Sequence, residues 1–174
     1  MANTKNTNST STTISTKPSS SEAEEIPQKV YFLGDTVEIG NFQITAESVE
    51  VTDRVASPIS ETVVFKPEEG SKYVVINTSV KNIGTDNNTF LPPIIAVKKD
   101  ISVKLVFGEY EFKSTSLLGH SDDLHTTSLN PLSSKTGLIA FQVADEVAQD
   151  LSDVKLVFSL DKDNYEYSLV KQTD

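Results

Sequence analysis

The 174-residue sequence contains no cysteine and no tryptophan, and it has only two histidines. The lack of cysteine excludes disulfide bonds, thiolate catalysis and cysteine-ligated zinc sites, although it does not fix the compartment. No apolar run approaches the roughly 18–20 residues that a membrane-spanning helix needs. No hydrophobic signal region follows Met1 either. The sequence as it stands therefore predicts neither a transmembrane helix nor an export signal.

Basic side chains are scarce as well. Fifteen Lys and Arg residues face 25 Asp and Glu residues, which gives a formal net charge of -10. All of this excess falls on residues 30–174, since residues 1–29 carry three lysines and three glutamates. An acidic body repels nucleic-acid phosphates and anionic lipid headgroups. We therefore expect no nucleic-acid partner, and no basic stripe with interleaved aromatic residues contradicts this.

The N-terminal stretch has little that could form a core. Twelve of residues 1–21 are Ser or Thr, and Ile14 is the only large apolar residue there after Met1. Such a composition cannot bury enough apolar surface to offset the entropy of ordering the chain. We predict a disordered linker over residues 1–29, which serves either as a tether or as a dispensable tail, and one folded domain over residues 30–174.

The most strand-like run of the domain lies between Gly70 and Gly84. Its centre, residues 73–80, is rich in β-branched and aromatic side chains, and turn-forming residues flank it on both sides. Alternate residues of one face are apolar, whereas the other face turns polar at Asn77 and Ser79. This pattern predicts a long central strand that ends near solvent.

Short alternating segments separated by turn residues fill the rest of the domain. The expected strands are residues 30–33, 36–39, 42–51, 62–65, 94–97, 103–107, 110–112, 138–143, 154–160 and 165–169, with an edge strand near 90–91. A change of phase after Ala46 predicts a β-bulge. Residues 53–60 are expected to form a loop because Pro58 disfavours a central strand. Residues 145–151 form the one convincing helical window, and this pattern predicts an antiparallel sandwich or barrel.

Three blocks of the sequence resemble a known family when they are taken in order. They are GDTVEIGNFQIT (34–45), PEEGSKYVVINTSVKN (67–82), and NPL (130–132) followed by GLIAFQV (137–143). These blocks are similar to a domain-of-unknown-function family of Gram-positive lipoproteins. Members have a telokin-like, immunoglobulin-type domain, as in the mycobacterial immunoprotective extracellular antigen. The resemblance implies an all-β, immunoglobulin-like antiparallel β-sandwich behind a disordered N-terminal linker, and it brings no catalytic residues.

The same resemblance implies a location. The family has a signal peptide, a lipid-modified cysteine and a polar linker before the domain, and residues 3–25 look like that linker. We therefore expect a protein on the extracellular face of the cell membrane or secreted from it. It would meet the membrane only through a lipid anchor that this chain lacks, and its partner would be an unknown protein or envelope component.

Both histidines lie in the segment HSDDLH, where His120, Asp122, Asp123 and His125 are the candidates for a metal site. Their spacing fits no established motif, so a solvated polar loop is the favoured interpretation, and we expect no metal and no cofactor. The enzyme alternative, metal-dependent or otherwise, requires a site in this same loop.

Other signs of catalysis are weak. The segment Asp161–Asn164 resembles a calcium loop only at its start, and a hairpin turn explains it better. There is no Gly-x-Ser-x-Gly elbow and no phosphate-binding glycine loop. We therefore predict no catalytic residue and no enzyme.

A binding surface is the remaining expectation. Tyr165 and Tyr167 share a face of the last strand and are the first candidates for a protein contact. The segments 53–60, 84–93 and 114–130 are candidate contact loops. The sequence thus favours a non-enzymatic interaction domain of a surface lipoprotein, with an envelope structural or stress protein that has no small ligand as the third interpretation.

Overall fold

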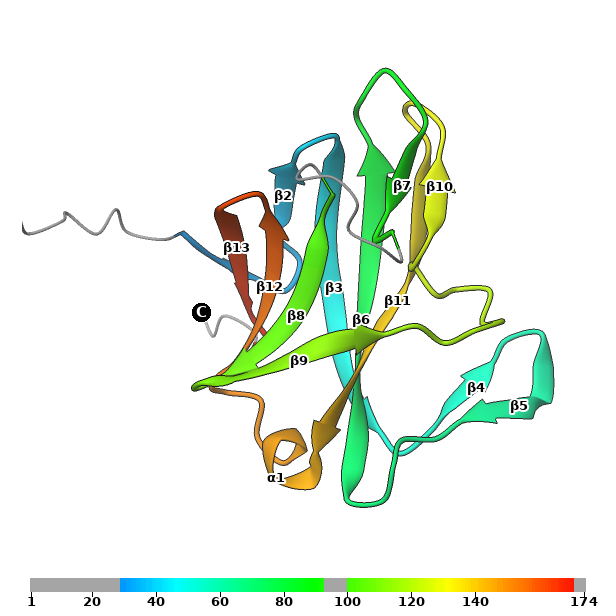
Figure 1. The fold of residues 1–174 in the computed structure, drawn as a ribbon, viewed down its shortest axis with the longest axis vertical. Coiled ribbons are helices and arrows are strands. Elements are labelled where there is room, and N and C mark those ends of the chain that lie inside the picture. The colour runs from blue at the N-terminus through cyan, green and yellow to red at the C-terminus, as the bar shows by residue number, and fades with distance from the viewer. Residues whose placement is uncertain (1–28, 93–99, 171–174) are drawn as a thin grey trace, which may run out of the picture.

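A computed structural model describes residues 29–92 and 100–170, and in these a single nine-stranded sheet curls so that its two halves face each other (Figure 1). Residues 1–28 of the expected linker (1–29) and the whole of the expected strand over residues 94–97 lie outside the described residues. No helix within the described part is long and apolar enough to cross a membrane.

Strand order follows the hydrogen bonds from one edge of the sheet to the other. The order is β1 (Val30–Phe32), β13 (Asp163–Ser168), β12 (Val154–Leu160), β8 (Ser102–Phe107), β9 (Tyr110–Thr115), β11 (Ser134–Ala144), β6 (Ser71–Asn82), β3 (Phe42–Thr52) and β2 (Thr36–Ile39). The β1–β13 pair is parallel, and the other pairs of the sheet are antiparallel. The prediction of an all-β, immunoglobulin-like β-sandwich is confirmed.

Three smaller elements complete the described fold. They are the hairpin of β4 (Val55–Ser57) with β5 (Ser60–Phe65), the antiparallel pair of β7 (Asn88–Phe90) with β10 (Thr127–Leu129), and the one-turn helix α1 (Asp145–Ala148). We call the β4–β5 hairpin the arm, because it stands away from the curled sheet in Figure 1. The arm corrects the expectation of a loop over residues 53–60. Pro58 lies in the hairpin turn, where a missing N–H costs nothing, and does not interrupt a strand.

Strand β9 passes from one half of the sheet to the other. Its first residues pair with β8, up to Lys113 opposite Lys104, whereas Ser114 pairs with Phe141 of β11. The two halves of the sandwich are therefore one hydrogen-bonded surface, and Ser114 lies where that surface turns.

The centre of the fold is the strand that the sequence indicated. β6 pairs with β3 on one side and with β11 on the other. Val74, Ile76 and Thr78 are fully buried, and Asn77 is exposed, as the two-faced pattern predicted. The register of β3 against β6 shifts between Ala46 and Ser48, so the predicted bulge is confirmed.

Tyr167 joins the two halves of the sandwich from inside. Its side chain is fully buried, and its hydroxyl donates to the carbonyl oxygens of Asp35 and Ile44, at 3.1 and 3.2 Å. Burial, which disfavours the phenolate, raises the pKa of Tyr167 well above its ordinary value. The hydroxyl therefore stays protonated, and it can always donate to the strand and turn opposite β13.

Replacing Tyr167 with Phe tests this contact. We expect the free energy of unfolding to fall by about 1–2 kcal/mol, because the hydroxyl is lost while the ring and its packing remain. Urea denaturation measures the change. Tyr110→Phe is the matched control, since Tyr110 is 68% exposed, and it should change stability by less than about 0.5 kcal/mol. An equal effect of both substitutions would contradict the assigned role of Tyr167.

Candidate functional site

The loop that holds both histidines lies directly on strand β11. We call residues 116–126 the docked loop. The Leu138 N–H donates to the Asp122 carbonyl oxygen at 2.7 Å, and the Leu124 N–H donates to the Leu138 carbonyl oxygen at 3.0 Å. This approach requires glycine at position 137, where an added Cβ would lie 2.2 Å from the Asp122 carbonyl oxygen. The segment expected to be a solvated polar loop is therefore held against β11 by backbone hydrogen bonds, and it runs into β10.

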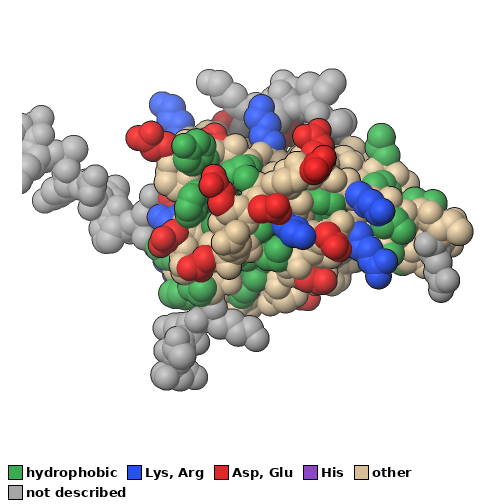
Figure 2. Space-filling model, turned by 90° about the horizontal axis from the view of Figure 1, so that it is seen from below, with side chains coloured by type: hydrophobic (Ala, Val, Ile, Leu, Met, Phe, Trp, Pro, Cys, Tyr) green, Lys and Arg blue, Asp and Glu red, His purple; other side chains and the backbone are tan. Residues whose placement is uncertain are grey.

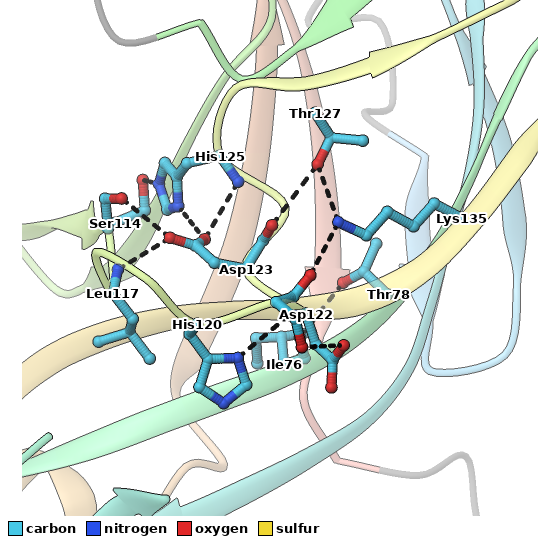
Figure 3. A network of polar contacts seen from close by, with 12 residues as sticks. Ile76, Thr78, Ser114, Leu117, His120, Asp122, Asp123, His125, Thr127 and Lys135 are labelled. Carbon is cyan, nitrogen blue, oxygen red and sulfur yellow. Dashed lines mark hydrogen bonds and ion pairs between the residues drawn. The ribbon is translucent and has the colours of Figure 1, made fainter. Parts of the chain in front are cut away.

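Asp123 is the centre of a polar network inside the docked loop (Figure 3). Its Oδ1 accepts from the His125 backbone N–H at 3.1 Å and lies 2.6 Å from His125 Nδ1. Its Oδ2 accepts from the Ser116 hydroxyl at 2.9 Å and from the Leu117 N–H at 2.8 Å. The other ring nitrogen of His125, Nε2, lies 2.9 Å from Ser114 Oγ.

The contacts of Asp123 determine its charge. Burial alone would raise the pKa of this carboxyl, but the hydrogen bonds from His125 and Ser116, together with the positive charge that His125 can carry, lower it. The net pKa is below the ordinary value for aspartate, so Asp123 is a carboxylate at neutral pH.

His120 lies in the same loop but contacts the arm. Its Nε2 is 3.1 Å from the Ala56 carbonyl oxygen, its Nδ1 accepts from the Asp122 N–H at 3.2 Å, and its ring centre is 6.1 Å from that of Phe65. Beneath this contact lies a second apolar cluster formed by Val55, Tyr73, Val75, Leu117, Leu138 and Ala140, with Phe65 packed against it. The docked loop and the arm are therefore one structural unit on the outer face of β6 and β11.

The four metal candidates do not converge. His120 bonds to the arm and His125 to Asp123 and Ser114, while the Asp122 side chain is exposed and accepts from the Ser121 hydroxyl. Among the described residues, no group of three or more His, Asp or Glu side chains is placed to hold a metal ion. What the structure brings together instead is Asp123, His125 and Ser114. Ser114 has no distinguishing signal in the sequence, because the strand switch of β9, not sequence spacing, places it beside His125.

A cavity of about 620 Å³ opens beside this network. Ser114, Ser116 and His125 line one part of it, and Ile101 and Val103 of the β8 region line another. Its size is within the range of small-molecule sites.

The two candidate contact tyrosines are not surface features. Tyr167 is fully buried, and Tyr165 is partly buried and packs against the main core. The expectation of a contact through Tyr167 is thus corrected: the face that Tyr165 and Tyr167 share points inward, toward the main core. The segment that resembled a calcium loop forms the turn of the β12–β13 hairpin.

Exposed aliphatic side chains gather instead on the arm. Ile59 is 75% exposed, and Val63 and Val64 are exposed as well. Leu118 of the docked loop is 86% exposed. On the face shown in Figure 2, acidic and basic side chains are interspersed among hydrophobic ones.

The protein is a β-sandwich domain. Its buried polar network lies in the docked loop, and its exposed aliphatic side chains lie mainly on the arm. A family model described as a domain of unknown function (DUF4352) matches residues 31–159. The chain belongs to this family, which confirms the resemblance to a domain-of-unknown-function family.

Solved structures of the same fold come from several bacteria. An uncharacterised β-sandwich protein of Clostridium difficile 630 is 19% identical, with a TM-score of 0.61 over 86% of this chain and 100% of that one. The yjhA protein of Bacillus subtilis is 14% identical, with a TM-score of 0.56 over 80% and 99% of the two chains. A conserved hypothetical protein of Bacillus anthracis is 19% identical, with a TM-score of 0.53 over 82% and 98%. No protein with a curated description matched this chain.

The Asp123 network makes a prediction about pH. Asp123→Asn removes the charge and turns an amide NH2 donor toward groups that already donate to Asp123. We therefore expect the free energy of unfolding at pH 7 to fall by about 2–3 kcal/mol. Because the folded pKa of Asp123 is lowered, its contribution is fully present above about pH 4, the ordinary aspartate value, and is lost as the pH falls through the folded pKa. Urea denaturation at pH 7, 5 and 3 should show the difference from wild type shrinking at pH 3.

Asp122→Asn, on the exposed neighbour, is the control and should have little effect at any of these pH values. A difference for Asp123→Asn that stays constant down to pH 3 would rule out this role for the charge.

Proposed function

We propose that this chain is a binding domain that recognises a protein or another envelope component through the arm and the docked loop. The observation that carries the proposal is the exposure of Ile59, Val63, Val64 and Leu118 on one structural unit. Single exposed aliphatic residues are common, but several on an element that projects from the body are typical of an interaction site.

The rigidity of this unit supports the same role. The arm is held from below by Val55 and Phe65 in the second apolar cluster, and from the side by the bond between His120 and the Ala56 carbonyl oxygen. A preorganised surface loses less conformational entropy on binding than a free loop. Two of the three contact segments expected from the sequence, 53–60 and 114–130, contribute to it.

Electrostatics restrict the partner. The chain carries a net charge of -10, and acidic side chains lie among the basic ones on the face in Figure 2. This negative charge repels the phosphates of nucleic acids and anionic lipid surfaces, and so disfavours binding to either. The partner we propose has an apolar patch with neutral or basic surroundings, and the role requires no catalysis.

We further propose that the domain is carried by a lipid-anchored protein on the extracellular face of a Gram-positive membrane, or is secreted. The Ser/Thr-rich composition of residues 3–25 and membership of the family support this location. The natural reading frame should therefore encode a signal peptide and a lipid-attachment cysteine upstream of the linker. A frame with no export signal would contradict the location and leave the binding role unaffected.

The binding role is tested by replacing the exposed side chains of the arm. We expect the full chain to bind envelope fractions of the source bacterium saturably in a pull-down assay. The double substitution Ile59→Ser and Val63→Ser should weaken binding at least about tenfold, because two apolar contacts are lost.

Leu132→Asn is the matched control. Leu132 is 74% exposed, like Ile59, but lies in the turn before β11, at a positive φ that Asn tolerates. The control should bind like wild type. Equal binding by all three proteins would refute the arm as the binding surface.

A further inference from the structure

Hydrogen bonds link three side chains in a row: Ser114 to His125, and His125 to Asp123. Ser114 Oγ lies 2.9 Å from His125 Nε2, and His125 Nδ1 lies 2.6 Å from Asp123 Oδ1. A neutral imidazole donates through one nitrogen and accepts through the other. Since Asp123 is a carboxylate that only accepts, the proton belongs on Nδ1, and Nε2 is left to accept the Ser114 hydroxyl proton. This is the order of contacts that activates serine in hydrolases of unrelated folds.

Contacts within the docked loop hold the His125 ring in this orientation. Both oxygens of Asp123 are occupied by donors from the docked loop, and the Asp123 and His125 side chains are only 7% and 12% exposed. The loop itself is fixed by its backbone bonds to Leu138. No rearrangement is therefore needed to bring His125 to Ser114.

The serine has access to a space that a small molecule can enter. Ser114 and His125 line the cavity of about 620 Å³, whose other lining residues include the apolar Leu91, Ile101 and Val103. A short acyl chain would find apolar contacts beside the hydroxyl.

Two of the four described non-glycine residues with positive φ line the same cavity. Leu91 and Thr126, which both line it, have positive φ angles of 47° and 58°, and the Thr126 N–H donates to the Leu91 carbonyl oxygen at 2.9 Å. A positive φ is costly for non-glycine residues, and most of all for a β-branched one such as threonine. Strained residues of this kind cluster at functional sites.

We propose that Ser114 is a nucleophile, activated by His125 and oriented through Asp123, that takes up the acyl group of small carboxylic esters. Ser114 Oγ forms a bond to the carbonyl carbon, and its proton passes to His125 Nε2. The tetrahedral adduct then expels the alcohol, which carries away that proton, and leaves an ester on Ser114. Water attacks this ester by the same route and releases the carboxylic acid. The inference goes beyond the proposed binding role and does not depend on it.

The first, bond-forming step can be tested without knowing the natural ester. The intact chain is treated with an alkyl fluorophosphonate, in which Oγ attacks phosphorus and fluoride leaves, and the adduct is located by peptide mass spectrometry. We expect one adduct per chain, on Ser114. Ser114→Ala should abolish it, and His125→Gln, which cannot accept the proton in the same way, should slow it by about 100-fold or more.

Ser121→Ala is the matched control. The Ser121 hydroxyl is in the same loop and also contacts an aspartate, Asp122, but no hydrogen bond joins it to either described histidine. This variant should react like wild type, and circular dichroism of each variant shows whether it is folded. A wild-type chain that forms no adduct, an adduct on another serine, or equal rates for wild type and a folded His125→Gln variant would overturn the proposal and leave Ser114 as a structural contact. The wild-type mapping decides the question even where a variant fails to fold.

Discussion

The contact on which both functional features depend is the approach of the docked loop to β11 at Gly137. With no side chain at this position, the Asp122 carbonyl oxygen can lie against the strand and accept from Leu138. The loop then has two fixed sides. Asp123 and His125 are placed toward Ser114, and His120 is placed toward the arm. A methyl group at position 137 would lift the loop and disturb both.

Much of the fold follows from alternation and turn chemistry. The apolar face of β6 and the phase change after Ala46 were sufficient to predict the central strand and the bulge in β3. The arm was only half predicted, since residues 62–65 were expected as a strand and lie within β5. Its first strand was missed because it has only three residues, too few for a period to be visible, and because Pro58 indicates a break as readily as a turn. The hairpin is stable here because Val55 and Phe65 pack on the outer face of the sheet, a tertiary contact that local patterns do not contain.

Only part of the Asp123–His125–Ser114 site could be predicted, because local sequence patterns do not contain contacts with other strands. The two histidines and two aspartates identified the right loop, but their grouping as metal ligands was a statement about sequence spacing. In the structure, the partner of His125 comes from β9, eleven residues away, at the point where that strand leaves β8 for β11. Alternation likewise showed that Tyr165 and Tyr167 share a face, but not that this face packs on the main core, where the Tyr167 hydroxyl reaches the Asp35 and Ile44 carbonyl oxygens.

The arm and the reactive serine are connected through one short segment. Leu118 is presented to solvent, Leu117 is buried in the second apolar cluster and donates its N–H to Asp123, and His120 holds the arm. A partner seated on Ile59 and Leu118 would therefore press on the residues that fix Asp123, and through it His125. These contacts lie within the docked loop, between the loop and the arm, and between the loop and Ser114 of β9. The sandwich supplies the rigid support and, through β9, Ser114, while the docked loop that Gly137 admits supplies His125 and Asp123.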